Sequence, residues 1–161
     1  MHRRSFIAIA LALSAGALAV DGCTTSLEPP PFTDVDPTTL TYAASLGVDF
    51  AAMTKLPSGL WVRDFVVGTG AAVATGKTVT VKYSGYLPSG VKFDENISAG
   101  IVFTVGSLNV IAGFDQGVIG MKVGGKRKLV MPPSLGYGAT VHGSIPANSV
   151  LIFDIELVSV T

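Results

Sequence analysis

From Leu60 to its C-terminus, the chain alternates short apolar segments with turns rich in glycine and proline. Val79 and Val81 alternate with Thr80 and Lys82, which is the pattern of a half-buried strand. Such segments are too short to be stable alone, so they must pair into a sheet. The strands predicted in this way cover residues 60–67, 78–83, 101–105, 126–131 and 150–158.

One segment lacks the strand pattern. Residues 113–119 show no β-rich alternation and are followed by Gly120, which predicts a single short helix. Several antiparallel strands with one helix indicate an α+β domain. In a chain of 161 residues that is 48% hydrophobic, there is enough apolar material for one such core. We therefore expect one domain over residues 60–161.

Two segments of different character precede this domain. Residues 23–41 are rich in proline and threonine and predict an extended tether. Residues 42–59 carry Leu46, Phe50 and Met53 at spacings that fit a short helix or a packed lead-in segment.

Residues 1–22 have the features of an export signal. Arg3 and Arg4 precede an apolar run over residues 6–20 that is too short and too rich in alanine for a good membrane span. The paired arginines fit the twin-arginine pattern, and they fit a general secretory signal as well. We expect an exported protein of the cell envelope or periplasm.

Cys23, the one cysteine of the chain, follows this signal directly. Residues 20–23 resemble a lipobox, in which the cysteine is acylated, although Asp21 departs from the usual small uncharged residue. A competing cleavage site lies at residues 17–19, and in that case Cys23 is an incidental thiol. The lipobox predicts attachment to a membrane through a lipid anchor.

Charge and histidine content exclude several classes of function. The chain has 11 Lys and Arg against 11 Asp and Glu, whereas nucleic-acid-binding proteins are normally basic. Its two histidines, His2 and His142, cannot supply a zinc site or a convincing Ser-His-Asp triad. Gly76-Lys77-Thr78 lacks the spacing of a phosphate-binding loop. We expect no metal, no cofactor and no nucleic-acid partner.

Widely separated aromatic residues give the first indication of a site. If the fold brings them together, they line a dry pocket for a small group. Taken singly, an aromatic residue at an alternating strand position is most often plain core. These residues are Tyr83, Phe93, Phe103, Phe114, Tyr137 and Phe153.

Three segments, residues 79–95 (VTVKYSGYLPSGVKFDE), 110–138 (VIAGFDQGVIGMKVGGKRKLVMPPSLGYG) and 145–158 (IPANSVLIFDIELV), resemble the FKBP-type peptidyl-prolyl cis-trans isomerases. The resemblance implies a twisted antiparallel sheet half-wrapped around one short helix. It also implies an enzyme that accelerates rotation about X–Pro bonds of exported proteins without covalent chemistry. Proline-containing polypeptides would be its substrates, macrolides its inhibitors, and a monomer its form.

The resemblance also assigns roles to residues. It makes Asp94 a buried carboxylate, aims the Tyr137 hydroxyl at a peptide carbonyl, and makes the backbone N–H of Ile111 a donor to a substrate carbonyl. Phe114 lies on the pocket floor, where many members have Trp. The implied catalytic residues are Tyr83, Phe93, Asp94, Tyr137 and Phe153, and the implied substrate-binding residues are Ile101, Phe103, Val110, Ile111, Phe114, His142 and Ile145.

Two alternatives remain open at this point. His142 fits the rim of the pocket and fits an ordinary solvated loop histidine equally well. The same pocket could also serve a binding module that holds a proline-containing partner, with catalysis incidental.

Overall fold

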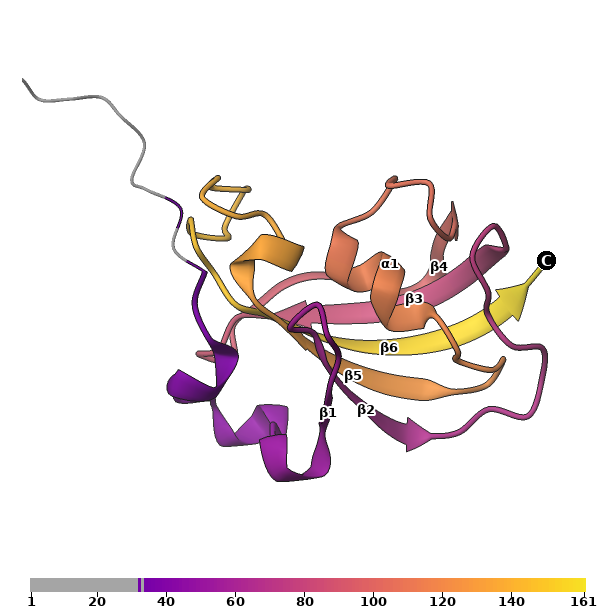
Figure 1. The fold of residues 1–161 in the computed structure, drawn as a ribbon, viewed down its shortest axis with the longest axis horizontal. Coiled ribbons are helices and arrows are strands. Elements are labelled where there is room, and N and C mark those ends of the chain that lie inside the picture. Colours follow the sequence, from indigo (N-terminus) through magenta and orange to yellow (C-terminus); the bar gives the residue numbers. More distant parts are fainter. Residues whose placement is uncertain (1–31, 33) are drawn as a thin grey trace, which may run out of the picture.

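The computed structural model describes residue 32 and residues 34–161, so the predicted signal and Cys23 lie outside the described part. In it, six antiparallel strands form one sheet, in the order β1-β2-β5-β6-β3-β4 (Figure 1). This is the α+β arrangement expected. The strands are β1 Thr54–Lys55, β2 Trp61–Val66, β3 Thr78–Tyr86, β4 Lys92–Thr104, β5 Lys126–Met131 and β6 Leu151–Val160.

Strand β4 differs most from the prediction. Only residues 101–105 were expected to be extended, yet β4 begins at Lys92 and pairs with β3 along most of its length. β4 is one of the two edge strands of the sheet, so its first half needs few buried apolar side chains. This polar composition lacks the apolar alternation by which the other strands were predicted. A turn at residues 88–90 connects β3 to β4.

Helix α1, Ala112–Val118, packs on one face of the sheet, where it was expected within two residues (Figure 1). Gly113 and Gly117 make this close approach possible. A Cβ atom at Gly113 would lie 2.6 Å from Met131 Sδ, and one at Gly117 would lie 2.5 Å from Leu129 Cδ1. Residues four apart share one face of a helix, so both glycines face β5. The poor helix propensity of glycine is offset by this packing.

The main core lies between α1 and this inner face of the sheet. Leu151, Phe153, Ile155 and Leu157 of β6 all point into it, as their alternation predicted. Ile152, between them, belongs to a second cluster on the opposite, outer face. The sheet is therefore packed on both faces, but by different parts of the chain.

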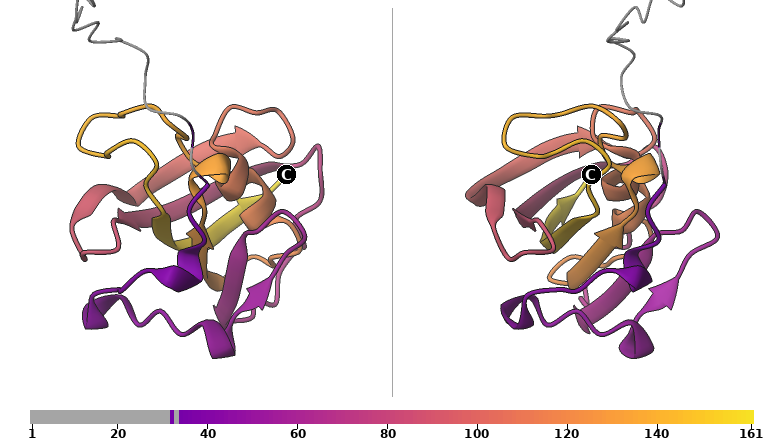
Figure 2. Two further views of the ribbon diagram at one scale, coloured as in Figure 1. Left: turned by 60° about the vertical axis from the view of Figure 1, so that its left-hand side comes forward. Right: turned by 90° about the vertical axis from the view of Figure 1, so that its left-hand side faces the viewer.

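The N-terminal segment covers part of the outer face (Figure 2). It forms three short 3-10 helices, η1 Pro37–Thr39, η2 Ala44–Leu46 and η3 Phe50–Ala52, rather than the single helix that its spacing allowed. The Phe50 ring lies edge-on to Trp61, with centroids 4.9 Å apart. The lead-in is thus part of the folded body.

The last residues of the predicted tether also contact the domain. Asp34 accepts hydrogen bonds from the backbone N–H and the hydroxyl of Ser134, at 3.2 and 3.1 Å. Asp36 caps η1 by accepting a hydrogen bond from the Thr38 N–H. Residues 34–41 therefore lie on the body instead of forming an extended spacer.

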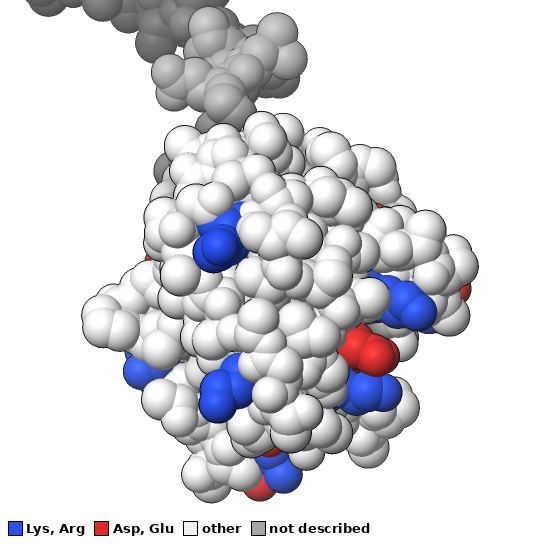
Figure 3. Space-filling view, turned by 90° about the vertical axis from the view of Figure 1, so that its right-hand side faces the viewer, with Lys and Arg blue, Asp and Glu red and all other residues white. Residues whose placement is uncertain are grey.

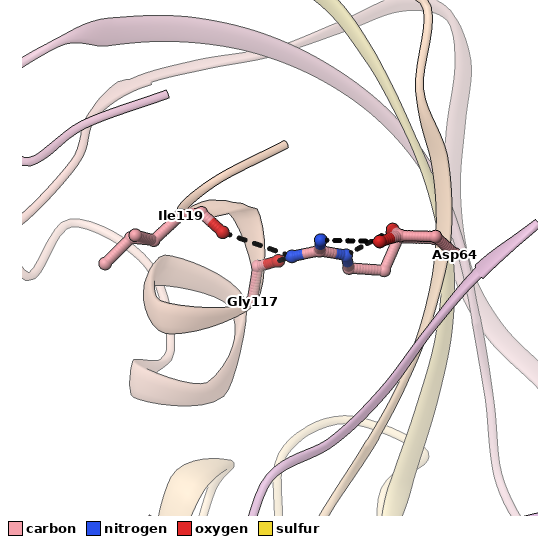
Figure 4. A network of polar contacts seen from close by, with 4 residues as sticks. Asp64, Gly117 and Ile119 are labelled. Carbon is pink, nitrogen blue, oxygen red and sulfur yellow. Dashed lines mark hydrogen bonds and ion pairs between the residues drawn. The ribbon is translucent and has the colours of Figure 1, made fainter. Parts of the chain in front are cut away.

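Arg127 of β5 connects the sheet to the end of α1 (Figure 4). Its guanidinium donates two hydrogen bonds to the Asp64 carboxylate, at 2.6 and 2.9 Å. It donates two more to the carbonyls of Gly117 and Ile119, at 2.8 and 3.1 Å. These carbonyls belong to the last turn, which has no intrahelical donors, so Arg127 acts as a C-terminal cap.

Charged side chains are scattered over the face seen in Figure 3, with uncharged surface between them. No helix in the described part of the chain is long and apolar enough to cross a bilayer.

Candidate functional site: an aromatic pocket beside helix α1

A cavity of about 400 Å³ opens between β3, β4, α1 and the segment after η4 (Pro133–Leu135). It lies on the same side of the sheet as α1, over the inner face. Its lining is mostly aromatic and aliphatic, with a few polar groups at its mouth. The lining residues are Tyr83, Phe93, Asp94, Ile101, Leu108, Asn109, Val110, Ile111, Phe114, Tyr137, His142 and Phe153.

Phe114 is the centre of the aromatic cluster. Its side chain is only 3% exposed, and it lies edge-on to Tyr83 and Phe153, with centroids 5.6 and 5.4 Å apart. Phe93 in turn packs edge-on against Phe153 at 5.5 Å. Edge-to-face contacts of this kind hold each ring in one orientation. The pocket therefore has an aromatic base that is fixed before any ligand binds.

Asp94 supplies the carboxylate at the pocket mouth. It accepts hydrogen bonds from the Tyr83 hydroxyl at 2.5 Å and from the Glu95 N–H at 2.8 Å. The expected burial of this carboxylate is wrong, because Asp94 is exposed. It lies on edge strand β4, which has no neighbouring strand on its outer side. Its effect on a ligand would be confined to the rim.

Two pocket tyrosines have raised pKa values. Burial, assisted by the hydrogen bond to Asp94 and by its charge, raises the pKa of Tyr83 from about 10 to about 12. Burial and the Asp94 charge also raise the pKa of Tyr137. Both hydroxyls are thus held in the protonated form, as hydrogen-bond donors, over the whole physiological range.

The raised pKa of Tyr83 predicts a loss of stability at high pH. The folded state holds this proton more tightly than the unfolded state, so the contribution of Tyr83 is complete below pH 10 and disappears as the pH rises toward about 12. Tyr83→Phe should therefore lose less stability than the wild type between these values. Urea denaturation across this window measures the difference, and equal losses in the two proteins would contradict the assignment.

Tyr137 and His142 form another part of the cavity lining. Their rings are stacked, with centroids 4.2 Å apart and an angle of 6° between the planes. His142 is exposed but lines the cavity, so the structure favours the rim position over an unattached loop position. A backbone bridge between His142 and Ile145 holds this loop.

The loop before α1 lines the cavity with residues 108–111. Among the described residues, none accepts a hydrogen bond from the Ile111 N–H, while the Ile111 carbonyl accepts two from the first turn of α1. Asp115, buried in α1, accepts the Gly106 N–H with both carboxylate oxygens, at 2.8 and 3.1 Å. Asp115 therefore fixes the loop that carries Ile111.

Most of the residues singled out from the sequence meet at this cavity. Two do not line it. Phe103 is buried behind Phe114, with centroids 5.9 Å apart. Ile145 is 3% exposed and lines a smaller adjoining cavity of about 140 Å³.

Two lining residues, Leu108 and Asn109, were missed. Leu108 is 79% exposed and has a positive φ of 58°, so it projects from the tip of the loop. A large apolar side chain held in solvent beside an apolar cavity is the signal that identifies it, and this signal requires the structure.

No group of three or more His, Cys, Asp or Glu residues within the described part of the chain is placed to bind a metal ion. The chemistry available here is that of an apolar, preorganised pocket with hydrogen-bond donors at its rim.

Comparison with known proteins places this site in a family. Residues 70–158 match the family described as FKBP-type peptidyl-prolyl cis-trans isomerase. FK506-binding protein 4 of Dictyostelium discoideum is 48% identical over 110 residues, which are 68% of this chain and 30% of that protein. The chain thus spans less than a third of the length of this relative and of a second curated relative, FK506-binding protein 4 of Rhizopus delemar.

Solved structures give the same result for the fold. The crystal structure of FkpA from Escherichia coli is 37% identical, with a TM-score of 0.63 over 68% of this chain and 52% of that one. A peptidyl-prolyl cis-trans isomerase from Pseudomonas syringae is 31% identical, with a TM-score of 0.63 over 73% and 86%. AtFKBP13 is 38% identical, with a TM-score of 0.60 over 68% and 98%. The chain therefore belongs to the FKBP-type peptidyl-prolyl cis-trans isomerase family.

Proposed function

We propose that this protein accelerates cis-trans rotation about X–Pro bonds in polypeptides. The observation that carries the proposal is the aromatic cavity, whose base is preformed and whose rim offers the Ile111 N–H and the protonated Tyr137 hydroxyl. These pocket residues suit a reaction in which no covalent bond is made or broken.

The physical basis is the partial double bond of the amide. It imposes a barrier of about 18–20 kcal/mol, and the planar amide is more dipolar than the twisted one. An apolar pocket therefore destabilises the planar ground state relative to the twisted transition state. The proline ring would rest on Phe114, between Tyr83 and Phe153, where water is excluded.

Hydrogen bonds at the rim of the pocket would hold the substrate polypeptide on either side of the rotating X–Pro bond. The Ile111 N–H is placed to donate to one substrate carbonyl and the Tyr137 hydroxyl to another. Asp94 acts on Tyr83 by accepting its hydroxyl proton in a hydrogen bond, which orients the ring against the pocket. Donors that fit the twisted form better than the planar one add to the acceleration.

The test is the cis-to-trans rate of a short peptide with an apolar residue before proline. The protein should accelerate it, and Asp94→Ala should lower kcat/KM about tenfold, the value of one hydrogen bond to a charged group. Lys92→Ala, in an exposed ion pair two residues away, is the matched control and should leave the rate unchanged. Binding without acceleration would instead indicate a proline-binding module.

Macrolide binding follows from the same pocket. Several relatives are named for FK506, and the cavity of about 400 Å³ has the size and apolar lining of a small-molecule site. We therefore propose that FK506 competes with the proline peptide.

We also propose that the protein is exported and held on a membrane of the cell envelope through acylated Cys23, where it acts on exported polypeptides. The support lies in the sequence, namely Arg3 and Arg4, the apolar run over residues 6–20, and Cys23 after it.

A labelled fatty acid tests the anchor. In a bacterial host it should be incorporated into the wild-type protein, and Cys23→Ser should abolish incorporation and release the protein from the membrane fraction. The matched control, Thr24→Ser, leaves the cysteine intact. Incorporation into Cys23→Ser, or none into the wild type, would contradict the anchor and favour cleavage at Ala19.

A further inference from the structure

The outer face of the sheet carries a second cavity, larger than the aromatic pocket. The N-terminal segment covers only part of this face, and beside it a groove of about 530 Å³ remains open. The groove crosses β2, β5, β6, β3 and β4 and is bordered by Leu46 and Gly47 of the N-terminal segment. Its floor consists of the outward side chains of the sheet, so it is separated from the aromatic pocket by the sheet itself.

The floor of the groove has an excess of positive charge. Glu156 lies opposite Lys82 on β3 and opposite Lys126 on β5, so one carboxylate stands between two ammonium groups. It lies 3.4 Å from Lys126 Nζ, and no carboxylate among the described residues forms an ion pair with Lys82. Lys128 is already neutralised by Asp154. The carboxylate of a ligand would therefore form an ion pair with Lys82.

Apolar side chains stand at both ends of this charged floor. Phe65 of β2 is 50% exposed and Ile97 of β4 is 60% exposed, and both line the groove. Phe65 and Ile97 therefore give the groove an apolar contact point at each end of its charged floor.

A bulge in β4 places Ile97 there. Val81 pairs with Ile101 and Tyr83 with Asn96, so residues 97–100 stand opposite Lys82 alone. The Asn96 side chain closes this bulge with two hydrogen bonds to the Gly100 backbone, at 3.1 and 2.9 Å. Gly100 has a φ of 76°, which suits glycine. The position of Ile97 beside Lys82 is therefore built into the strand.

We propose that this groove is a second binding site, for an extended acidic polypeptide segment that carries an apolar side chain next to a carboxylate. The carboxylate joins Lys82 and Lys126, and the apolar side chain packs on Ile97 or Phe65. From β2 to β4 there are four interstrand gaps of about 4.8 Å, so the groove accepts about six extended residues. No proline is required, so this site goes beyond the isomerase function.

The probe is a fluorescently labelled peptide of about six residues that repeats Glu-Phe and contains no proline, titrated onto the full chain by fluorescence anisotropy. Lys82→Glu should weaken binding about tenfold, because it replaces an attraction with a repulsion. Ile97→Ser should weaken it about threefold by removing an apolar contact. Lys77→Glu makes the same charge change on an exposed lysine outside the groove and should have no effect.

An NMR titration that follows the backbone amide resonances of the protein shows where the peptide binds. Shifts confined to residues around Lys82, Lys126 and Ile97 support the groove. Shifts confined to the aromatic pocket, equal weakening by Lys77→Glu, or no binding near 1 mM peptide would overturn it. Acceleration of a short X–Pro peptide, measured on Lys82→Glu, should match the wild type. That assay measures the isomerase function separately from peptide binding in the groove. The proposed second binding site can therefore fail while the proposed isomerase function stands, and the reverse also holds.

Discussion

Replacing Phe114 with alanine should lower the free energy of unfolding by about 3–5 kcal/mol, the range for a buried phenylalanine. The side chain is 3% exposed and is in contact with Tyr83, Phe103 and Phe153, so its removal leaves a cavity bounded by three rings. These rings lose their edge contacts, and the base of the pocket is lost with them. Catalysis should consequently fall by more than the tenfold expected of Asp94→Ala.

Chemical denaturation measures the first effect and the X–Pro peptide assay the second. Phe65→Ala is the matched control, because Phe65 is 50% exposed on the other face of the sheet and should cost less than about 1 kcal/mol. A loss of stability at Phe114 no larger than at Phe65 would show that the cluster is not the core of the site. If Phe114→Ala is too unstable for the assay, Phe114→Leu keeps most of the volume and still removes the ring.

Arg127→Ala should lower the free energy of unfolding by about 2–4 kcal/mol. The Arg127 side chain is 12% exposed, and its guanidinium makes four hydrogen bonds, two to Asp64 and two to the carbonyls that end α1. Its loss leaves the Gly117 and Ile119 carbonyls without this donor, and it disconnects α1 from β2. The helix that carries Phe114 then shifts more easily, so the substrate KM should rise.

The neighbouring residue supplies the control. Lys126 pairs with Glu156 at 3.4 Å, with both side chains largely in solvent, so Lys126→Ala should cost at most about 1 kcal/mol. Arg127→Lys keeps the charge but loses the planar guanidinium, so its cost in stability should lie between those of Lys126→Ala and Arg127→Ala. Equal costs at positions 126 and 127 would mean that the network contributes no more than a surface ion pair.

The strands that could be predicted are those whose side chains alternate between core and surface. Along β6, Leu151 to Leu157 face the core at every second position, and that period is visible in the sequence. The first half of β4 has no such period, because an outermost strand can be polar on both faces. Helix α1 was predicted by its lack of alternation, although its fit depends on two glycines that contact β5.

The aromatic pocket was predictable because its residues lie in segments resembling a known family. Leu108 and Asn109 could not be found in this way, since their place at the rim depends on the path of a loop. The exposure of Asp94 depends on its strand being outermost. The outer groove depends on where the N-terminal segment stops covering the sheet, which no local pattern encodes.

The bulge at residues 97–100 also affects how copies of this protein behave at high concentration. Strand β1, at one end of the sheet, has two residues, whereas β4, at the other, has 13. A long, regular outermost strand is a template for pairing with a second molecule and so for aggregation. The bulge divides β4 into two shorter runs that are out of register with each other. At high concentration the protein would thereby resist edge-to-edge association at β4 without any covering segment.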